Sequence, residues 1–172
     1  RLGAAQQQGS ATAAVYIELA AEYLRQGNFS AALTNARKAV IVAPGEPTAH
    51  NMRALVHQQL GENALAERHF REAVRLDPKD PYANNAFGSF LCNLKRYPQA
   101  QVYFDAAVAN PLNPSPWVPL GNAGICLYEQ GEIDAAERYF RRALRTNPKF
   151  APALLRMASI SSSKGNHLST RA

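Results

Sequence analysis

The sequence predicts an all-α solenoid built from copies of one helix-turn-helix unit. Three series of small residues support this prediction, because each keeps the same step along the chain. The first series steps by 34, 34, 36 and 34 residues: Ala20, Ala54, Gly88, Gly124 and Ala158. The other two step by 34, 34 and 36 residues: Ala32, Ala66, Ala100 and Ala136, and then Ala39, Ala73, Ala107 and Ala143. A repeated scaffold of this kind favours a binding protein over an enzyme.

The first unit contains two helical patterns separated by a glycine. Between Val15 and Arg25 the apolar residues recur at i, i+3, i+4, i+7 and i+8, which predicts an amphipathic helix. Gly27 ends this helix, and a second one is predicted from about Ser30 to Val42. Pro44 then stops the second helix, because proline lacks the amide donor. The residues before the first helix, 1–12, are rich in Gln, Ala, Gly and Ser, and we expect them to form a flexible segment.

The same pattern continues to the end of the chain, with Gly61 at the turn and Pro78 at the stop of the second unit. The predicted units are 13–46, 47–80, 81–116 and 117–150, followed by a partial fifth unit at 151–172, all in one solenoid domain, 13–172. Small residues are expected where the two helices of a unit cross, and Phe70, Phe104 and Phe140 are expected to fill the gap to the neighbouring unit. Because a solenoid needs a terminal unit with a polar outer face, we expect this chain to be part of something longer.

The third unit departs from the pattern. Lys95 stands where the other units have a glycine between their helices. The segment 110–119 contains four prolines and two residues more than the standard unit, so a longer extended connector is predicted there. It either bends the superhelix or lengthens a surface loop, and the loop is the simpler interpretation.

The unit resembles the tetratricopeptide repeat, and the resemblance covers nearly the whole chain. It implies a right-handed superhelix in which the first helices of successive units line a concave groove. The candidate partner-binding residues of this groove are Ile17, Ala21, Asn51, Met52, Leu55, Asn85, Ser89, Asn93, Asn122, Ile125 and Tyr128. Their amides can pair with the backbone of a bound peptide or helix, and their apolar side chains can anchor it. Asn84 and Asn85, which follow Pro81, can equally serve as caps or bridges between helices.

Composition excludes several classes of function. The chain has 172 residues, of which 47% are apolar, and no run is long enough to span a membrane. Its net charge of +6 is not accompanied by basic clusters interleaved with aromatic residues, so nucleic acid is not expected as a partner. The densest basic stripe is Arg138, Arg141, Arg142 and Arg145. A solvated outer face is the favoured interpretation of this stripe, and a docking patch for an acidic partner or lipid headgroups is the alternative.

Motifs for catalysis or metal binding are absent from the sequence. There is no nucleophile elbow, phosphate-binding glycine loop or pair of histidines at i, i+4. His57 takes a packing position of the repeat, and the other histidines are His50, His69 and His167. No enzyme, metal or cofactor is therefore predicted.

Cys92 and Cys126 lie late in the first helices of consecutive units, so stacking places them side by side. A bridge is geometrically possible, and two small buried thiols are the equally supported alternative. An oxidising compartment would favour the disulfide.

The runs at 84–92, 103–107 and 122–126 resemble the third and fourth repeats of the PilF/PilW family, the tetratricopeptide lipoproteins of type IV pilus biogenesis in Gram-negative bacteria. The resemblance implies a pilotin-like, non-catalytic scaffold on the periplasmic face of the outer membrane, with the secretin or another pilus component as its protein partner. It also implies a bridge between Cys92 and Cys126, which match the cysteine pair of PilW-like members. The lipidated cysteine expected near the mature N-terminus of the family is not in this chain, so a membrane connection is expected only through an anchor that the chain lacks.

A generic cytosolic adaptor that binds a peptide in its concave groove is the alternative function. Chaperone-binding members of that class share a carboxylate clamp of lysine, asparagine and arginine. The equivalent places here hold Ile17 and Ala21, then Met52, then Tyr82 and Ala86, so the clamp is absent.

Overall fold

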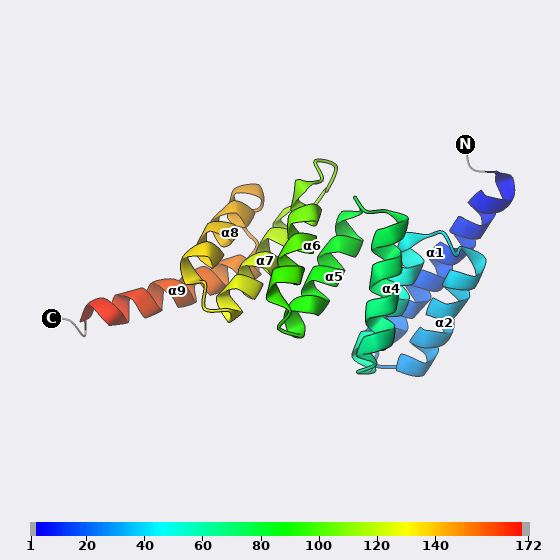
Figure 1. Ribbon diagram of the computed structural model, residues 1–172, viewed down its shortest axis with the longest axis horizontal. Helices are drawn as coiled ribbons and strands as arrows, with labels where there is room; N and C mark the ends of the chain where they lie inside the picture. Colours follow the sequence, from blue (N-terminus) through cyan, green and yellow to red (C-terminus); the bar gives the residue numbers. More distant parts are fainter. Residues whose placement is uncertain (1–2, 170–172) are drawn as a thin grey trace. The chain divides into compact units, whose positions relative to one another are not determined.

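The computed structural model describes residues 3–169, and the side chains up to residue 165. Within this range the chain forms nine helices and no strand (Figure 1), so the all-α prediction is confirmed. The helices are α1 Ala4–Arg25, α2 Phe29–Val42, α3 Pro47–Gln59, α4 Asn63–Leu76, α5 Pro81–Asn93, α6 Tyr97–Ala109, α7 Trp117–Glu129, α8 Ile133–Thr146 and α9 Ala151–Ser169. The side chain of His167 lies outside the described part.

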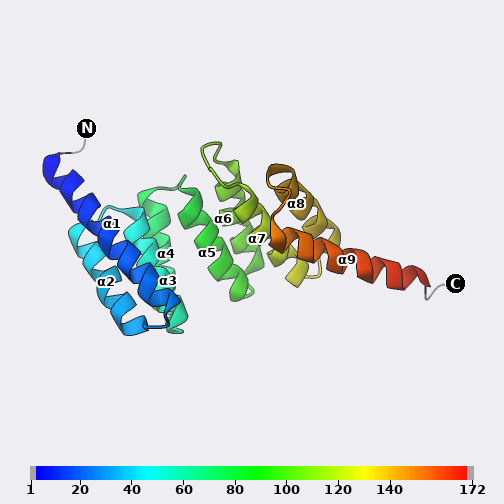
Figure 2. The same cartoon turned by 180° about the vertical axis from the view of Figure 1, so that it is seen from behind.

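The chain divides into two compact units, Arg1–Phe87 and Gly88–Ala172, with the boundary inside α5. In the first unit α1 packs against α2 and α3, and α3 packs against α2 and α4, as Figure 2 shows from behind. In the second unit α7 packs against α6, α8 and α9, and α8 also contacts α9. Each unit thus consists of successive helix pairs, and the assignment of residues 13–172 to one continuous domain stays a prediction.

The turns inside the helix pairs use a left-handed residue at the predicted place. Gly27, Gly61 and Gly131 have φ angles of +72°, +74° and +83°, a region that suits glycine because it has no Cβ. Lys95 holds the same place in the third pair with φ 59°. A lysine side chain makes this conformation costly, so the third pair contains a local strain that the other pairs avoid.

Replacing Lys95 with glycine is therefore expected to stabilise the protein by about 1 kcal/mol. The gain comes from removing the Cβ clash of the left-handed conformation, less the extra freedom that glycine gives the unfolded chain. Urea unfolding of the two proteins measures it. Lys95→Ala is the control, because alanine keeps the Cβ and should leave the midpoint nearly unchanged; equal midpoints for all three proteins would contradict the interpretation.

The connector between α6 and α7 is a surface loop. It is shorter than predicted, because α7 begins at Trp117 and includes Pro119 in its first turn, where a missing N–H has no intrahelical partner to lose. Two asparagines shape the loop: Asn110 Oδ1 accepts from Leu112 N at 2.9 Å, and Asn113 Oδ1 accepts from Ser115 N at 2.9 Å. Side-chain turns of this kind replace the helical hydrogen bonds that the prolines prevent.

The N-terminal helix is longer than predicted. A flexible segment is expected at 1–12, but residues 4–12 belong to α1, which begins at Ala4; residues 1–2 lie outside the described part. Its Ala- and Gln-rich sequence has high helix propensity, and Ala13 is fully buried against α2 and α3 residues. Gly9 lies so close to α2 that a Cβ there would stand 2.8 Å from the Val42 carbonyl oxygen. This close approach explains a glycine within the helix.

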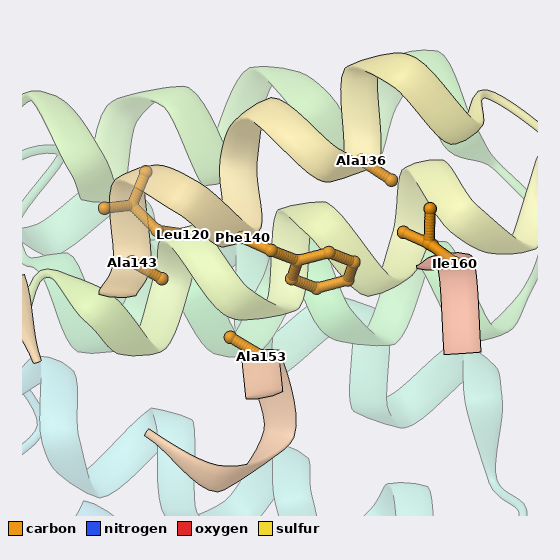
Figure 3. Packing of buried hydrophobic residues seen from close by; sticks show 6 residues of the cluster. All are labelled: Leu120, Ala136, Phe140, Ala143, Ala153 and Ile160. Carbon is orange, nitrogen blue, oxygen red and sulfur yellow. The ribbon is translucent and has the colours of Figure 1, made fainter. Parts of the chain in front are cut away.

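Aromatic rings fill the spaces left by the small-residue series. A Cβ added at Gly124 would lie 2.6 Å from the Phe140 ring, and one at Gly88 would lie 2.9 Å from the Phe104 ring. These rings therefore pack on the first helix of their own pair, in addition to the neighbouring unit that the sequence indicated. Figure 3 shows Phe140 among Leu120, Ala136, Ala143, Ala153 and Ile160, which come from α7, α8 and α9.

None of the helices in the described range combines the length and apolarity needed to cross a bilayer.

Candidate protein-interaction site

A depression of about 170 Å³ lies on the second unit, and we call it the α5–α7 groove. Its lining comes from α5, α7 and one ring of α6: Ser89, Cys92, Asn93, Phe104, Asn122, Ile125 and Glu129. The structure thus brings together four of the predicted groove residues, namely Ser89, Asn93, Asn122 and Ile125. The surface is mixed, with amides and a hydroxyl beside an apolar side chain, which suits a peptide segment better than a small apolar ligand.

Helical spacing explains why these side chains share one face. Asn122, Ile125 and Glu129 stand at i, i+3 and i+7 on α7, and Ser89, Cys92 and Asn93 stand at i, i+3 and i+4 on α5, which also share one side of a helix. Residues at i, i+3 and i+7 form one stripe of an α-helix. Sequence reasoning missed Cys92, Phe104 and Glu129 as lining residues, although the stripe begun by Asn122 and Ile125 passes directly to Glu129.

A disulfide closes one side of the α5–α7 groove. Cys92 and Cys126 are bonded in the structure, with 5.9 Å between their α-carbons, so the structure contains the bridged alternative. Both are buried, and Cys92 also lines the groove. The bond ties the end of α5 to α7, which holds the two lining stripes together.

Glu129 gives the α5–α7 groove its charge. Its Oε2 atom lies 3.7 Å from the Cys92 sulfur, and its side chain is exposed. Among the lining residues it is the one with an ionisable group, since the cysteine is bonded. A bound segment that offers a cation or several N–H donors would therefore match this surface.

Tyr128 does not line this groove. Its ring packs against the core of the second unit, Arg156 lies over the ring at 5.3 Å, and its hydroxyl is 3.5 Å from the Ser159 hydroxyl. These contacts direct Tyr128 toward α9, which contributes nothing to the lining of the groove.

The predicted groove residues of the first unit are half-buried, and their surroundings differ. Ile17 packs against the cluster of Ala13, Ala39, Ala43 and Ala49, and Met52 packs against the cluster of Ala20, Ala32, Ala36 and Val56. Ala21 lines a separate depression along α1, with Val15, Glu18, Leu19, Glu22 and Arg25. Asn51, Leu55 and Asn85 are half-buried, and the side-chain oxygen Oδ1 of Asn51 is buried without a hydrogen-bond partner among the described residues.

Asn84 has a structural role. Its side-chain amide donates to the carbonyl oxygens of Pro78 at 3.0 Å and Asp80 at 2.8 Å, and its side chain is buried. His50 holds the same repeat position and bonds the Pro44 carbonyl oxygen at 2.8 Å in the same way. Both side chains tie a first helix to the proline that ends the preceding one, which supports the bridging interpretation for Asn84.

Three histidines stack between α3 and α4. The His69 ring lies 5.7 Å from the His50 ring and 5.6 Å from the His57 ring, measured between centroids. His57 is buried, as its packing position predicts, and its Nδ1 atom lies 2.6 Å from Glu62 Oε2. In the described part of the chain no three His, Cys, Asp or Glu side chains are placed to share a metal ion.

Comparison with known proteins gives two stretches that match the tetratricopeptide-repeat family, residues 17–81 and 119–150. The chain is also 31% identical over 145 residues to the type IV pilus assembly protein PilF of Pseudomonas aeruginosa. This match covers 84% of the chain and 58% of PilF, so the chain spans less than two thirds of that relative.

Two solved structures have the same fold. The crystal structure of PilW, described as a widely conserved type IV pilus biogenesis factor, superposes with a TM-score of 0.80 at 33% identity, over 89% of this chain and 70% of PilW. The structure of Pseudomonas aeruginosa PilF superposes with a TM-score of 0.86 at 28% identity, over 95% of this chain and 74% of PilF.

Proposed function

The chain belongs to the PilF/PilW-like family of tetratricopeptide-repeat proteins, and on that premise we propose that it is a non-catalytic scaffold of type IV pilus biogenesis. It acts at the periplasmic face of the outer membrane of a Gram-negative cell, as a pilotin-like protein. Its partner is the secretin or another component of the pilus machinery.

The α5–α7 groove is the observation that carries this proposal. It presents amides and a hydroxyl for the backbone of a partner segment, Ile125 for an apolar side chain, and Glu129 for a cation. The disulfide beside it supports an oxidising compartment over the cytosol, because cytosolic thiols are kept reduced. This compartment argues for the periplasmic scaffold and against the cytosolic adaptor.

A charge reversal tests the groove. Glu129→Arg is expected to weaken binding to the purified, detergent-solubilised secretin of the same organism by about tenfold, because it replaces the attraction of a partner cation with repulsion. Biolayer interferometry with the immobilised chain measures the change. Glu129 is exposed, so the variant should fold as the parent does, and circular dichroism checks this.

Glu132→Arg is the matched control, since Glu132 is exposed on the same unit, changes the net charge equally and lies outside the groove lining. An equal loss of affinity in both variants would show that the α5–α7 groove is not the binding site. If the parent chain binds neither the secretin nor the other purified pilus-assembly components, the proposed role in pilus biogenesis is wrong.

A further inference from the structure

The outer side of α8 and the turn after it carry four cations that pair with no carboxylate in the part of the chain that the structure describes. We call them the α8 arginine face: Arg138, Arg142 and Arg145 on the helix, and Lys149 in the turn. The first three lie at i, i+4 and i+7, so they share one side of the helix over about 10 Å. The buried residues Ala136, Phe140 and Ala143 occupy the opposite side. The sequence alone favoured a solvated surface here, and the structure supplies the contacts that change this interpretation.

Helix α4 can be compared with α8 within the same chain, because its charged residues stand at the same repeat positions. On α4, Arg71 pairs with Glu67 at 2.6 Å and Arg75 pairs with Glu72 at 2.7 Å. On α8 the first pair recurs as Arg141 and Glu137 at 2.6 Å. The second does not, because Arg142 occupies the place of Glu72.

The remaining carboxylates of α8 are directed elsewhere. Lys164 of α9 lies 2.6 Å from Glu137 and 3.5 Å from Asp134. Glu137 is thereby held between Lys164 and Arg141, whose hydrogen bonds lower its pKa to about 2. Asp134, one turn before Arg138, points to Lys164, so the described residues offer Arg138 and Arg145 no ion pair.

Arg142 is positioned by an aromatic ring. Its guanidinium lies over the Tyr139 ring, 5.1 Å from the centroid. The Tyr139 hydroxyl donates to Asp105 Oδ1 at 3.0 Å and accepts from Gln101 Nε2 at 2.9 Å, both on α6. These bonds fix the ring, and the ring in turn holds the guanidinium of Arg142 on the outer face.

We propose that the α8 arginine face is a docking surface for an acidic segment of a partner protein. Guanidinium groups bind carboxylates through two parallel N–H···O bonds, and three arginines along one helix side match a segment with several Asp or Glu residues. A membrane surface fits less well, because helices that lie on bilayers insert an apolar side, and the apolar side of α8 is buried. The large hydrophobic residues that are exposed in the described part of the chain include none from α8.

The test uses a synthetic peptide of about twelve residues that carries four glutamates at helical spacing, and the same peptide with glutamines. At about 50 mM salt the intact chain should bind the glutamate peptide and not the glutamine peptide, and the affinity should fall steeply as salt is added. Arg138→Glu with Arg145→Glu should weaken binding by about tenfold or more. Both residues are exposed, so the fold is retained.

Arg68→Glu with Arg75→Glu is the matched control, since it changes the same repeat positions of α4 and the same net charge. This control should change the affinity by less than about threefold. Equal weakening in both double variants would show that the affinity depends on net charge alone, and this would overturn the proposal. So would failure to bind the glutamate peptide, or binding to phosphatidylglycerol vesicles in its place. The proposal does not depend on the α5–α7 groove, and Glu129→Arg should leave peptide binding intact.

Discussion

Removing the disulfide by Cys92→Ala with Cys126→Ala is expected to lower the free energy of unfolding by about 4 kcal/mol. The bond joins residues 34 positions apart, and a cross-link of that length removes much of the conformational freedom of the unfolded chain. Both cysteines are buried, so alanine is preferred to serine, which would bury a hydroxyl without a partner.

Urea unfolding measures this loss in the unit that contains the bond. The chain has one tryptophan, Trp117 at the start of α7, so its fluorescence reports the second unit, while far-ultraviolet circular dichroism reports all helices. The parent protein in dithiothreitol should match the double variant without it, and dithiothreitol should not change the variant further. Equal midpoints for oxidised and reduced parent protein would contradict the expected stabilisation.

The order of helices could be predicted because glycines and prolines mark the ends of the helices in the sequence. Gly27, Gly61 and Gly131 provide left-handed turns, and prolines end the second helices, so local rules and tertiary structure agree. The errors occur where a local rule is overridden. Proline rules predict an extended segment up to Pro119, but Pro119 lies in the first turn of α7. The composition of residues 4–12 predicts flexibility, but these residues extend α1.

The candidate site was only partly predictable for a different reason. A repeat position indicates which side of a helix a residue occupies, and this was sufficient to bring Ser89, Asn93, Asn122 and Ile125 into one groove. The repeat position does not indicate which side chains on that side pack into the core and which stay on the surface. Ile17, Met52 and Tyr128 occupy equivalent sides but their side chains pack into clusters, because neighbouring alanines leave space for them.

The stack of His50, His57 and His69 also could not be predicted from repeat positions. The spacing of His50, His57 and His69 excludes a metal-binding pair on one helix, and it says nothing of contacts between α3 and α4. Two of these side chains occupy positions where other repeats have aromatic or amide side chains: His69 aligns with Tyr103 and Tyr139, and His50 aligns with Asn84. The core of the first unit therefore contains histidine side chains, and we expect acid to lower the stability of this unit.

Acidification from about pH 7.5 to about pH 5 is expected to destabilise the first unit by about 2 kcal/mol through His69. Burial lowers the pKa of His69 from 6.5 to about 4, helped by electrostatic repulsion from the neighbouring Arg53, His50, His57 and Arg68. Between these two pKa values the unfolded chain binds a proton that the folded chain does not. The contribution of neutral His69 to the free energy of unfolding is therefore fully present above pH 6.5 and is lost as the pH falls toward 4.

His69 is held in the stack by His50. His50 Nε2 lies 2.8 Å from the Pro44 carbonyl oxygen, which fixes the His50 ring against the start of α3. The Nδ1 atoms of His50 and His69 lie 3.5 Å apart, so the His69 ring packs directly on this fixed ring.

His69→Tyr separates this effect from general acid destabilisation, because tyrosine occupies the same repeat position on α6 and α8 and does not titrate in this range. Urea unfolding at the two pH values should show the loss by circular dichroism in the parent protein and a much smaller loss in the variant. The Trp117 signal should shift little in either protein, since the stack belongs to the first unit. If the variant retains the full pH dependence, His69 is not its source, and the remaining histidines of the stack, His50 and His57, become the groups to replace.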